Sequence, residues 1–380
     1  MNTLTATPTP EQTLTSPTTE IPLHEREFTH ILLWMPNWIG DVILAIPTVQ
    51  SLRVRYPNAR ITAVVQESAY EILSAHPAID SVIKLAFTDD LGILDRLQFA
   101  ADLKKYQFDL AVVFPNSFRS ALMARLSEAK VRLGYDTEFR KFLLTNPTPT
   151  TRISKTEYRV NYFFKILAPL GIKTLETKYQ PFISRAAYDS AKVFLDNLGM
   201  HASDFLITIH PTTSKPERSW HAERYAMLCQ RLIKEYPAKI VLLGGEKDAS
   251  LLEKIKGHNS GGRIVTLPQL SLQETAVIIE KSSLFIGNDS GMMHLAAMVG
   301  TPLVGIFGPG SPATSGPFID PQKKVTVSQN FPCSPCRQKF FKECKPSAHN
   351  KPNCLEDISV KELIEAVEKL IQKTGKKFRS

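Results

Sequence analysis

The sequence contains no long hydrophobic run. Within its 380 residues, no apolar stretch approaches the roughly 20 residues that a helix needs to cross a bilayer. The first 20 residues hold eight threonines and three prolines but no lysine or arginine, so the basic start and apolar centre of a secretory signal are absent. Such a segment buries too little surface to offset its ordering entropy. We therefore expect residues 1–25 to be a disordered tail and the protein to reside in the cytoplasm.

The common nucleotide-binding fingerprints are also absent. A G-x-G-x-x-G turn should follow the first strand of a dehydrogenase domain, but residues 35–41 carry a single glycine, and residues 244–246 do not complete such a turn. The P-loop pattern G-x-x-x-x-G-K-[ST] is missing as well. These absences count against redox and NTP-hydrolysis functions. No D-x-D carboxylate pair stands at a suitable strand end, which agrees with a site that needs no metal ion.

Cysteine is scarce and unevenly placed. Four of the five cysteines fall within residues 333–354, and in a reducing compartment this pattern favours free thiols or a metal site over disulfides. Cys333 and Cys336 have the two-residue gap of a structural zinc site, but Cys344 and Cys354 do not form a second tight pair. A reduced, thiol-rich loop is the preferred interpretation and zinc is the alternative. No metal or other cofactor is expected.

The composition is that of a globular protein with excess basic charge. Hydrophobic residues make up 43% and charged residues 22% of the chain, and its length suits two domains. The net charge of +9 favours an anionic partner, which leaves nucleic acid, anionic lipid and phosphorylated small molecules. Nucleic acid is not expected, because the sequence has no recognition helix, zinc finger or RNP-type pattern.

Apolar runs alternate with helical patterns in both halves of the chain, which predicts parallel sheets covered on both faces. In the first half we expect strands at 29–35, 60–66, 81–85, 109–114 and 130–134, and helices at 40–56, 91–106, 117–126 and 158–170. In the second half we expect strands at 205–210, 239–244, 263–266, 283–287 and 302–307, and helices at 221–235, 249–256, 272–281 and 290–299. A last helix at 360–372 has an apolar stripe, so it should pack against the domain.

This pattern predicts an α/β protein with two Rossmann-like domains that face each other across a cleft. The expected domains are residues 26–184 and 185–357. Residues 358–380 would form the last helix and a basic tail, which we expect to be solvated.

Three segments place small and polar residues at strand ends. The first is the run Trp-Ile-Gly-Asp that ends at Asp41. Its glycine lets the backbone turn sharply and leaves room for a ligand. Asp41 would project from the carboxyl end of the first strand, where open α/β sheets bind ligands. On spacing alone, an acid that stabilises a helix N-terminus is the simpler interpretation.

The other two segments follow strands of the second half and suit a phosphorylated ligand. Residues 210–220 combine hydroxyl groups with cations that can offset the charge of a diphosphate. Residues 287–294 lie where a strand passes into a helix, so backbone N–H groups and the helix dipole converge on an anion site. A polar loop, a helix cap and a core histidine are the structural alternatives. The candidate binding residues are Thr212, Thr213, Lys215, Arg218, Asp289, Ser290, Gly291 and His294.

Taken together, these segments resemble glycosyltransferase family 9, the ADP-heptose:lipopolysaccharide heptosyltransferases. The resemblance covers residues 29–372 and rests on W-I-G-D-V-I-L-A-I-P-T, H-P-T-T before a tryptophan, N-D-S-G-M-M-H-L-A-A and G-T-P-L-V-G-I-F-G-P, in this order. The early tryptophan and the cysteine-rich segment are more similar to heptosyltransferase II than to I. The resemblance implies a GT-B fold and inverting transfer of L-glycero-D-manno-heptose from ADP-heptose to the inner core of lipopolysaccharide.

The resemblance also implies a role for each candidate residue. Asp41 falls on the Gly-Asp of the family, whose carboxylate acts as the catalytic base. The segment that contacts the diphosphate is matched by Thr212, Thr213 and Arg218, although similar enzymes often have lysine at the last position. The D-[ST]-G-x-x-H signature, which holds the nucleotide and phosphates, is matched by Asp289, Ser290, Gly291 and His294. Near the place of a ribose contact stand Glu246 and Asp248.

The first half is implied to bind the acceptor, Kdo-lipid A with its inner-core sugars, and the second half ADP-heptose. Because this acceptor is anionic and lies in the inner leaflet of the inner membrane, a peripheral position on that surface is expected. Basic residues near such a surface contribute about 1 kcal/mol each, and a solvated basic face is the alternative. The basic residues concerned are Arg119, Arg125, Lys130, Arg132, Arg140 and Lys141.

Two other functions stay open at this point. One is a related transferase of the heptosyltransferase I or III type, with another nucleotide-sugar or acceptor position. The other is a catalytically silent protein that binds a nucleotide-sugar. A base at Asp41 together with the phosphate-binding segments argues against silence, because binding alone needs no base.

Overall fold

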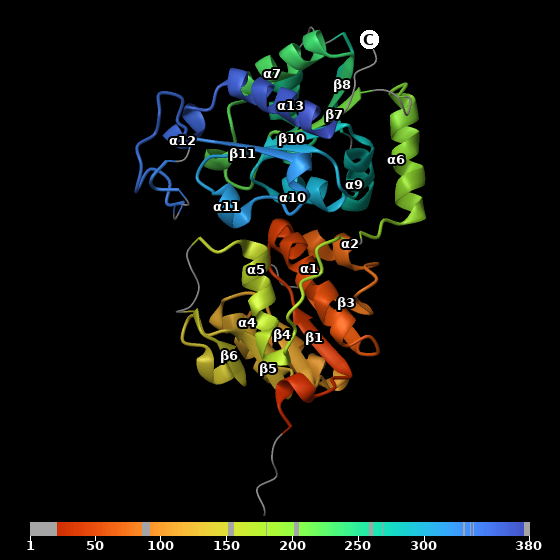
Figure 1. Cartoon of the computed structure of the whole chain (residues 1–380), viewed down its shortest axis with the longest axis vertical. Coiled ribbons are helices and arrows are strands. Elements are labelled where there is room, and N and C mark those ends of the chain that lie inside the picture. The colour runs from red at the N-terminus through yellow and green to blue at the C-terminus, as the bar shows by residue number, and fades with distance from the viewer. Residues whose placement is uncertain are drawn as a thin grey trace, which may run out of the picture.

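Two sheets of six parallel strands form the framework of the protein, and the domains built on them are stacked along the long axis of the molecule (Figure 1). The computed structural model describes residues 21–85, 92–150, 156–179, 181–200, 205–257, 261–267, 269–329, 331–334, 336 and 338–375. Residues 1–20 of the expected tail and residues 376–380 of the basic tail lie outside this part of the chain. Among the helices described, not one is long and apolar enough to cross a membrane.

Residues 21–25 correct the predicted boundary of the tail. Leu23–Glu25 form a 3-10 helix, η1, and Leu23 packs against the hydrophobic core. Arg55 donates a hydrogen bond from Nη2 to the His24 carbonyl oxygen at 3.1 Å. These contacts hold the segment on the first domain, so the prediction of disorder is wrong for these residues.

The first sheet is built from continuous apolar runs, as expected for strands covered on both faces. Its strands are β1 (His30–Trp34), β2 (Arg60–Gln66), β3 (Ser81–Leu85), β4 (Leu110–Val113), β5 (Val131–Tyr135) and β6 (Asn146–Thr148). They lie in the order β3-β2-β1-β4-β5-β6. The sequence analysis missed β6, which is three residues long and contains Pro147. Proline is tolerated in a strand at the edge of a sheet, and β6 occupies that position.

The second sheet repeats the topology of the first. Its strands are β7 (Phe205–His210), β8 (Ala238–Leu242), β9 (Ile264–Thr266), β10 (Leu284–Asn288), β11 (Leu303–Phe307) and β12 (Lys324–Ser328). Their order is β12-β11-β10-β7-β8-β9, which counted from β7 is the doubly wound order of the first sheet. The edge strand β12, half-buried along its length, was not predicted. The predicted strands agree with those observed to within two residues at either end.

Helices cover both faces of the sheets. In the first domain they are α1 (Ile39–Arg55), η2 (Glu67–Ala69), α2 (Tyr70–Leu73), α3 (Ile93–Asp102), η3 (Leu103–Tyr106), α4 (Phe118–Leu126), η4 (Lys141–Leu143), α5 (Arg159–Phe164) and η6 (Lys165–Leu170). In the second domain they are α6 (Arg185–Asn197), η7 (Pro216–Arg218), α7 (Ala222–Glu235), η8 (Glu246–Asp248), α8 (Ala249–Lys256), α9 (Leu272–Lys281), α10 (Gly291–Met298), α11 (Pro312–Ser315), η9 (Pro321–Lys323), α12 (Asn353–Glu356) and α13 (Val360–Thr374).

Two of these helices bear on the sequence predictions. Helix α6 was not predicted, although Tyr188, Phe194 and Leu195 pack against the core beside its buried residues Ala187 and Ala191. The apolar stripe predicted on the last helix is confirmed, since Leu363, Val367 and Leu370 lie in the core of the second domain. Helix α13 packs on α7 and β12, so it belongs to that domain.

Arg140 corrects the prediction of a basic surface in the first domain, because its side chain is fully buried. Its Nε donates a hydrogen bond to the Tyr135 carbonyl oxygen at 2.7 Å. Its Nη1 donates to the carbonyl oxygen of Pro115 and, at 3.1 Å, to Ser120 Oγ. Burial lowers the pKa of Arg140 to about 10, so the guanidinium remains charged at neutral pH. It holds the loop after β5 against the start of α4.

Replacing Arg140 by alanine should therefore destabilise the first domain. The change leaves buried carbonyl oxygens without a donor, and we expect a loss of roughly 3 kcal/mol or more. Thermal and urea unfolding of the full chain measure the effect. The adjacent Lys141 is exposed, so the control Lys141→Ala should change stability by less than about 0.5 kcal/mol. Equal effects for the two variants would contradict the structural role of Arg140.

Candidate active site

The candidate site lies where the two sheets reverse their strand order. In each sheet the first strand pairs with its second and fourth strands, so the strand order reverses between β1 and β4, and between β7 and β10. Open α/β sheets bind ligands at such switch points. Helices α1 and α10, which begin there, contact each other across the domain boundary, and Figure 1 shows them facing one another.

Two glycines allow this close contact. A Cβ atom on Gly40 would lie 2.7 Å from Cδ2 of His294, and one on Gly291 would lie 3.2 Å from Cβ of Ile39. Any side chain at Gly40 would therefore push the two helices apart. The glycines bring the first turn of α1, which carries Asp41, to the start of α10.

Asp41 lies beside two cations. The Nε of Arg159 is 3.6 Å from Oδ1 of Asp41, and the Asp41 side chain is 35% exposed. The surrounding protein removes water from the carboxyl group and raises its pKa, whereas the positive charges of Arg159 and Arg218 oppose this shift. A carboxylate with these properties can accept a proton from a bound hydroxyl group.

The sequence analysis missed Arg159. This residue begins α5, and α5 packs against α1, so the contact with Asp41 depends on the fold. No motif surrounds Arg159 in the chain, and one arginine among many basic residues carries no local signal.

Arg218 and Asp289 form a partly buried ion pair on the opposite side of the boundary. The Arg218 Nη2 donates to the Asp289 carbonyl oxygen at 2.8 Å and to its Oδ2 at 3.1 Å. The Asp289 side chain is 13% exposed, and burial raises its pKa to about 6 while Arg218 opposes the shift. Among the described residues, no group accepts a hydrogen bond from the buried Nε of Arg218, so this N–H keeps its capacity as a donor.

The start of α10 offers further donors. Ser290 occupies the N-cap position but makes no side-chain cap hydrogen bond; its Oγ lies 3.3 Å from Nδ1 of His210. The N–H groups of the first turn are therefore free of a side-chain cap, and such N–H groups attract anions. One turn later, the buried Nδ1 of His294 has no partner. Burial, reinforced by Arg218, lowers the pKa of His294 to about 4, so this side chain is neutral at pH 7.

The loop after β7 carries the predicted hydroxyl groups. Thr212 is buried, and its Oγ1 lies 3.3 Å from Asp248 Oδ2 and 3.3 Å from His210 Nε2. The Oγ1 of Thr213 donates to the Lys215 carbonyl oxygen at 2.5 Å. Lys215 is exposed, and its Nζ lies 6.0 Å from the centre of the Phe340 ring. The structure thus groups Thr212 and Thr213 at the strand end and places Lys215 on the outer side of the loop.

Of the two candidates for a ribose contact, Glu246 is the more available. Asp248 Oδ2 accepts a hydrogen bond from the Gly245 N–H at 2.9 Å and also contacts Thr212. Its carboxylate is therefore used to hold the loop. Glu246 is exposed just beyond the carboxyl end of β8.

Asn288 is a second residue whose role the sequence did not reveal. It is fully buried at the end of β10. Its Oδ1 accepts a hydrogen bond from the Trp220 N–H at 3.0 Å, and its Nδ2 donates to the Pro211 carbonyl oxygen at 2.8 Å. This side chain ties both ends of the loop 211–220 to the strand that leads to Asp289. An asparagine at a strand end is usually interpreted as a turn residue, so only the fold shows that Asn288 holds this loop.

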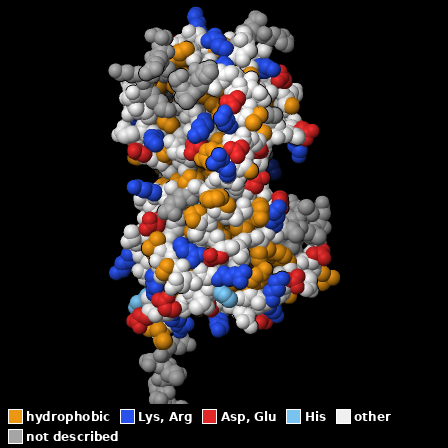
Figure 2. Space-filling model, turned by 90° about the vertical axis from the view of Figure 1, so that its right-hand side faces the viewer, with side chains coloured by type: hydrophobic (Ala, Val, Ile, Leu, Met, Phe, Trp, Pro, Cys, Tyr) orange, Lys and Arg blue, Asp and Glu red, His pale blue; other side chains and the backbone are white. Residues whose placement is uncertain are grey.

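The basic residues of the first domain divide into two groups. Arg140 and Arg132 are structural: Arg132 Nε donates to the Leu143 carbonyl oxygen at 2.8 Å, and Arg140 is buried as described above. On the face that Figure 2 shows, lysines and arginines are spread over both domains and form no single patch. The exposed members of the predicted set are Arg119, Arg125, Lys130 and Lys141.

The chain is similar to known transferases along most of its length. A family model described as glycosyltransferase family 9 (heptosyltransferase) matches residues 96–345. Lipopolysaccharide heptosyltransferase 2 of Salmonella typhimurium is 26% identical over 323 residues, covering 79% of this chain and 89% of that protein. Relatives named heptosyltransferase 3, from Escherichia coli, and heptosyltransferase 1, from Campylobacter coli, are each 25% identical.

Solved structures agree with the predicted fold. The structure of E. coli ADP-heptose LPS heptosyltransferase II superposes with a TM-score of 0.73 at 22% identity, covering 92% of this chain and 100% of that one. A family 9 glycosyltransferase from Veillonella parvula superposes with a TM-score of 0.78 at 23% identity, covering 93% and 99%. The predicted α/β architecture of the GT-B type is thereby confirmed. The chain belongs to glycosyltransferase family 9, the heptosyltransferases.

Proposed function

We propose that the protein transfers L-glycero-D-manno-heptose from ADP-heptose to the inner core of lipopolysaccharide, with inversion at the anomeric carbon. One observation carries this proposal. The Asp41 carboxylate of the first domain lies at the α1–α10 contact, opposite the Arg218–Asp289 pair and the uncapped start of α10. A base on one domain therefore faces an anion site on the other, as transfer between an acceptor and a nucleotide-sugar requires.

The proposed reaction is a single displacement. Asp41 takes the proton of the acceptor hydroxyl group as its oxygen bonds to the anomeric carbon. The bond from that carbon to the diphosphate breaks at the same time, and ADP leaves with the electron pair. Positive charge develops at the anomeric carbon between the two domains, as in other glycosyl transfers.

The second domain supplies the groups that stabilise the leaving diphosphate. Free N–H groups at the start of α10 and the unpaired Nε of Arg218 offer fixed dipoles and charge where the negative charge grows. Thr213 and His294 would contribute neutral hydrogen bonds, and Lys215 would add charge at the rim. Glu246 is placed to bind the ribose. With these groups, the proposed transfer needs no metal ion.

We place the reaction at the heptosyltransferase II step. The support is the relatives named heptosyltransferase 2, at 26% identity over 76–79% of the chain. Relatives of types 1 and 3 match at 24–25%, so a different acceptor heptose is the nearest alternative. Transfer by the purified protein from ADP-heptose to inner-core acceptors that carry no, one or two heptoses distinguishes these types.

The acceptor would bind to the first domain, and an aromatic patch there suits a membrane surface. The patch consists of Phe118, Phe139 and Phe142, which are 40%, 93% and 72% exposed. Glu138 and Phe139 both have positive φ angles, of 47° and 55°, a strained backbone for residues other than glycine. The buried Arg140 holds this loop in place. Strain and rigid support for exposed rings indicate a function in contact with another apolar phase.

Charge complements the patch. Arg119 directly follows Phe118 and Lys141 directly precedes Phe142; both are exposed, and basic residues attract the anionic inner leaflet. We therefore assign the patch to peripheral contact with the cytoplasmic face of the inner membrane, where a lipid-linked acceptor lies.

Two substitutions should separate catalysis from donor binding. In Asp41→Asn the base is lost, and we expect turnover with ADP-heptose and acceptor to fall about 10²- to 10⁴-fold, while ADP affinity stays close to that of the wild type. In Arg218→Gln we expect ADP binding to weaken roughly ten- to a hundredfold. Turnover assays and calorimetry measure the two effects. Arg218→Gln also leaves the Asp289 carboxylate without its cation partner. The variant His294→Ala therefore tests the same site without removing a charge.

Clear outcomes would contradict these assignments. Substantial turnover in Asp41→Asn would contradict the assignment of Asp41 as the base. Unchanged ADP binding in both Arg218→Gln and His294→Ala would contradict the assignment of the donor site. Wild-type protein that binds ADP yet transfers no sugar would instead support a silent binding protein.

The rate should also depend on pH through Asp41. The base acts when deprotonated, so kcat/KM rises with pH through the raised pKa of Asp41 and is constant above it. Arg159 lowers this pKa, so Arg159→Gln should raise it and shift the acidic limb of the pH–rate profile to higher pH. Lys165→Gln, on the η6 turn that follows α5, serves as a control because Lys165 pairs with Glu157. Identical acidic limbs in wild type and Arg159→Gln would contradict the coupling.

The aromatic patch is tested with vesicles. Wild-type protein should sediment with phosphatidylglycerol vesicles more than with phosphatidylcholine vesicles. The affinity of the double variant Phe139→Ser/Phe142→Ser for phosphatidylglycerol vesicles should fall roughly tenfold or more, because two apolar side chains no longer leave water on binding. Val54→Ser removes a similarly exposed side chain from α1 (65%) and should have no effect. Equal sedimentation of all three proteins would exclude the patch as a membrane contact.

A further inference from the structure

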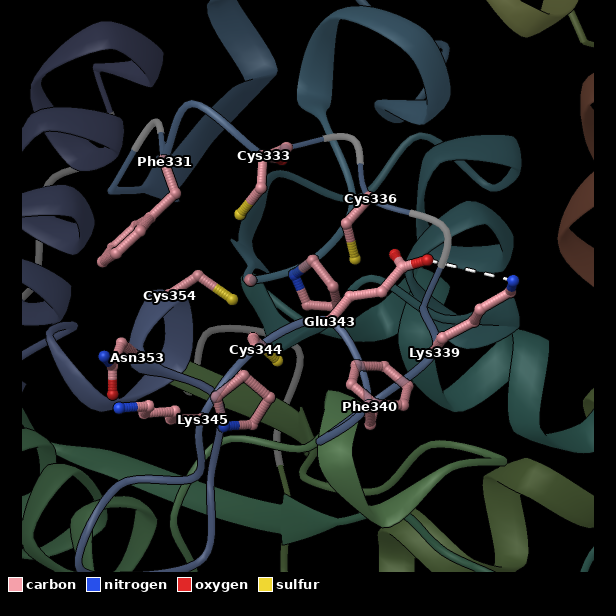
Figure 3. Close-up of a pocket in the computed structure, with 14 residues that line it drawn as sticks. Phe331, Cys333, Cys336, Lys339, Phe340, Glu343, Cys344, Lys345, Asn353 and Cys354 are labelled. Carbon is pink, nitrogen blue, oxygen red and sulfur yellow. Dashed lines mark ion pairs between the residues drawn. The ribbon is translucent and has the colours of Figure 1, made fainter.

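Four cysteines surround one cavity beside the donor segments. The cavity has a volume of 380 Å³, and its lining includes Cys333, Cys336, Cys344 and Cys354. Figure 3 shows these side chains around its interior, with sulfur atoms directed inward from different parts of the segment. Cys354 belongs to α12, whereas the other three lie in the loop before it. The fifth cysteine, Cys229, is buried in α7 within the core of the second domain.

We propose that these four thiolates bind one thiophilic divalent ion, zinc, in a structural site. Four cysteine ligands suit tetrahedral zinc, which then has no open position for catalysis. Among the described residues, the group whose ligand atoms all lie within 4.8 Å of one another is His221, His349 and Glu356. The four sulfur atoms are therefore spaced more widely around the cavity, and the ion would draw them together.

The segment is suited to such closure. Between Phe331 and Lys351 it has no regular helix or strand in the residues described, and an isolated bridge joins Pro346 to Pro352. Loops of this kind change shape at low cost. Metal ligands are commonly brought together in this way when the ion itself stabilises the folded loop.

Groups around the thiols match a thiolate centre. The Gln338 N–H donates a hydrogen bond to Cys336 Sγ at 3.2 Å, with Gln338 at a φ of 55°. Hydrogen bonds of this kind orient metal ligands and reduce their charge. Zinc with four thiolates carries a net charge of −2, and Lys339 and Lys345 line the same cavity. Glu343 is the acidic residue in the lining, and its Oε1 lies 3.9 Å from Nζ of Lys339.

The site would support the donor segments from behind. The Cys336 N–H donates to the Pro309 carbonyl oxygen at 3.1 Å, and Ser334 Oγ donates to the Gly310 carbonyl oxygen at 2.6 Å. Gly310 lies so close to Asp289 that a Cβ atom there would be 2.3 Å from its Oδ2. The ion would thus hold the turn that packs against the Asp289 carboxylate.

The same segment also reaches the loop after β7. Phe340 lies under the ammonium group of Lys215, and Lys351 Nζ donates to the Pro216 carbonyl oxygen at 2.8 Å. Loss of the ion should therefore weaken nucleotide binding without any direct contact between the ion and the ligand. This inference does not depend on which sugar or acceptor the enzyme uses.

Elemental analysis of the full-length protein, purified from zinc-supplemented cells, tests the site directly. Wild type and the control Cys229→Ser should each contain about one zinc ion per chain. Cys333→Ser/Cys336→Ser should lose the ion, since replacing ligands lowers metal affinity by at least about tenfold. Wild-type protein without zinc, or a double variant with as much zinc as wild type, would overturn the proposal.

A second measurement covers the case in which the double variant does not fold. Wild-type protein stripped with a chelator should take up Co²⁺ and show the intense sulfur-to-cobalt absorption of a thiolate complex, and added Zn²⁺ should remove it. Stripped protein should also bind ADP more weakly than zinc-loaded protein, with the loss restored by Zn²⁺. Absence of the cobalt signal, or mass spectrometry showing disulfides among these cysteines in freshly purified protein, would exclude the site.

Discussion

The contact between the N-terminal ends of α1 and α10 is the constraint on which the site depends. Each helix begins at the switch point of its own sheet, and Gly40 and Gly291 remove the side chains that would keep the two ends apart. The contact sets the position of Asp41 relative to Arg218, because both are carried by segments that start at this junction. The proposed base on one domain and the proposed anion site on the other would act together only while the domains hold this arrangement.

Charged side chains of opposite sign lie together in this junction. Asp41 is partly and Asp289 largely covered by protein, and the loss of water raises the pKa of each carboxyl group. The positive charges of Arg159 and Arg218 offset the free-energy cost of burying these carboxylates, since a buried charge needs a partner. The Nη2 of Arg218 donates to Asp289, whereas its Nε has no partner among the described residues. In the proposed mechanism, a diphosphate would bind without first breaking the ion pair, so that Asp289 continues to hold Arg218 in place.

The sequence predicted those parts of the fold and site that depend on local pattern. Buried central strands such as β1 and β10 are continuous apolar runs, and each is followed directly by the polar residues that the strand delivers to the sheet edge. The two strands that were missed lack that pattern: β6 is three residues long and contains Pro147, and β12 is half-buried along its length. Arg159 and Asn288 act through contacts with segments far away in the chain, and no neighbouring residue marks them.

Net charge proved a weaker guide than position, because several arginines bind backbone oxygens of the protein itself. Arg53 donates to the carbonyl oxygens of Ala59 and Pro57, and Arg224 donates to that of Ile358. Arg140 likewise binds backbone oxygens. Such arginines tie loops together and contribute little field at the surface. The anion affinity that we propose for the site would then come from a few oriented groups, chiefly the start of α10 and Arg218, whose interactions are strongest where water is excluded.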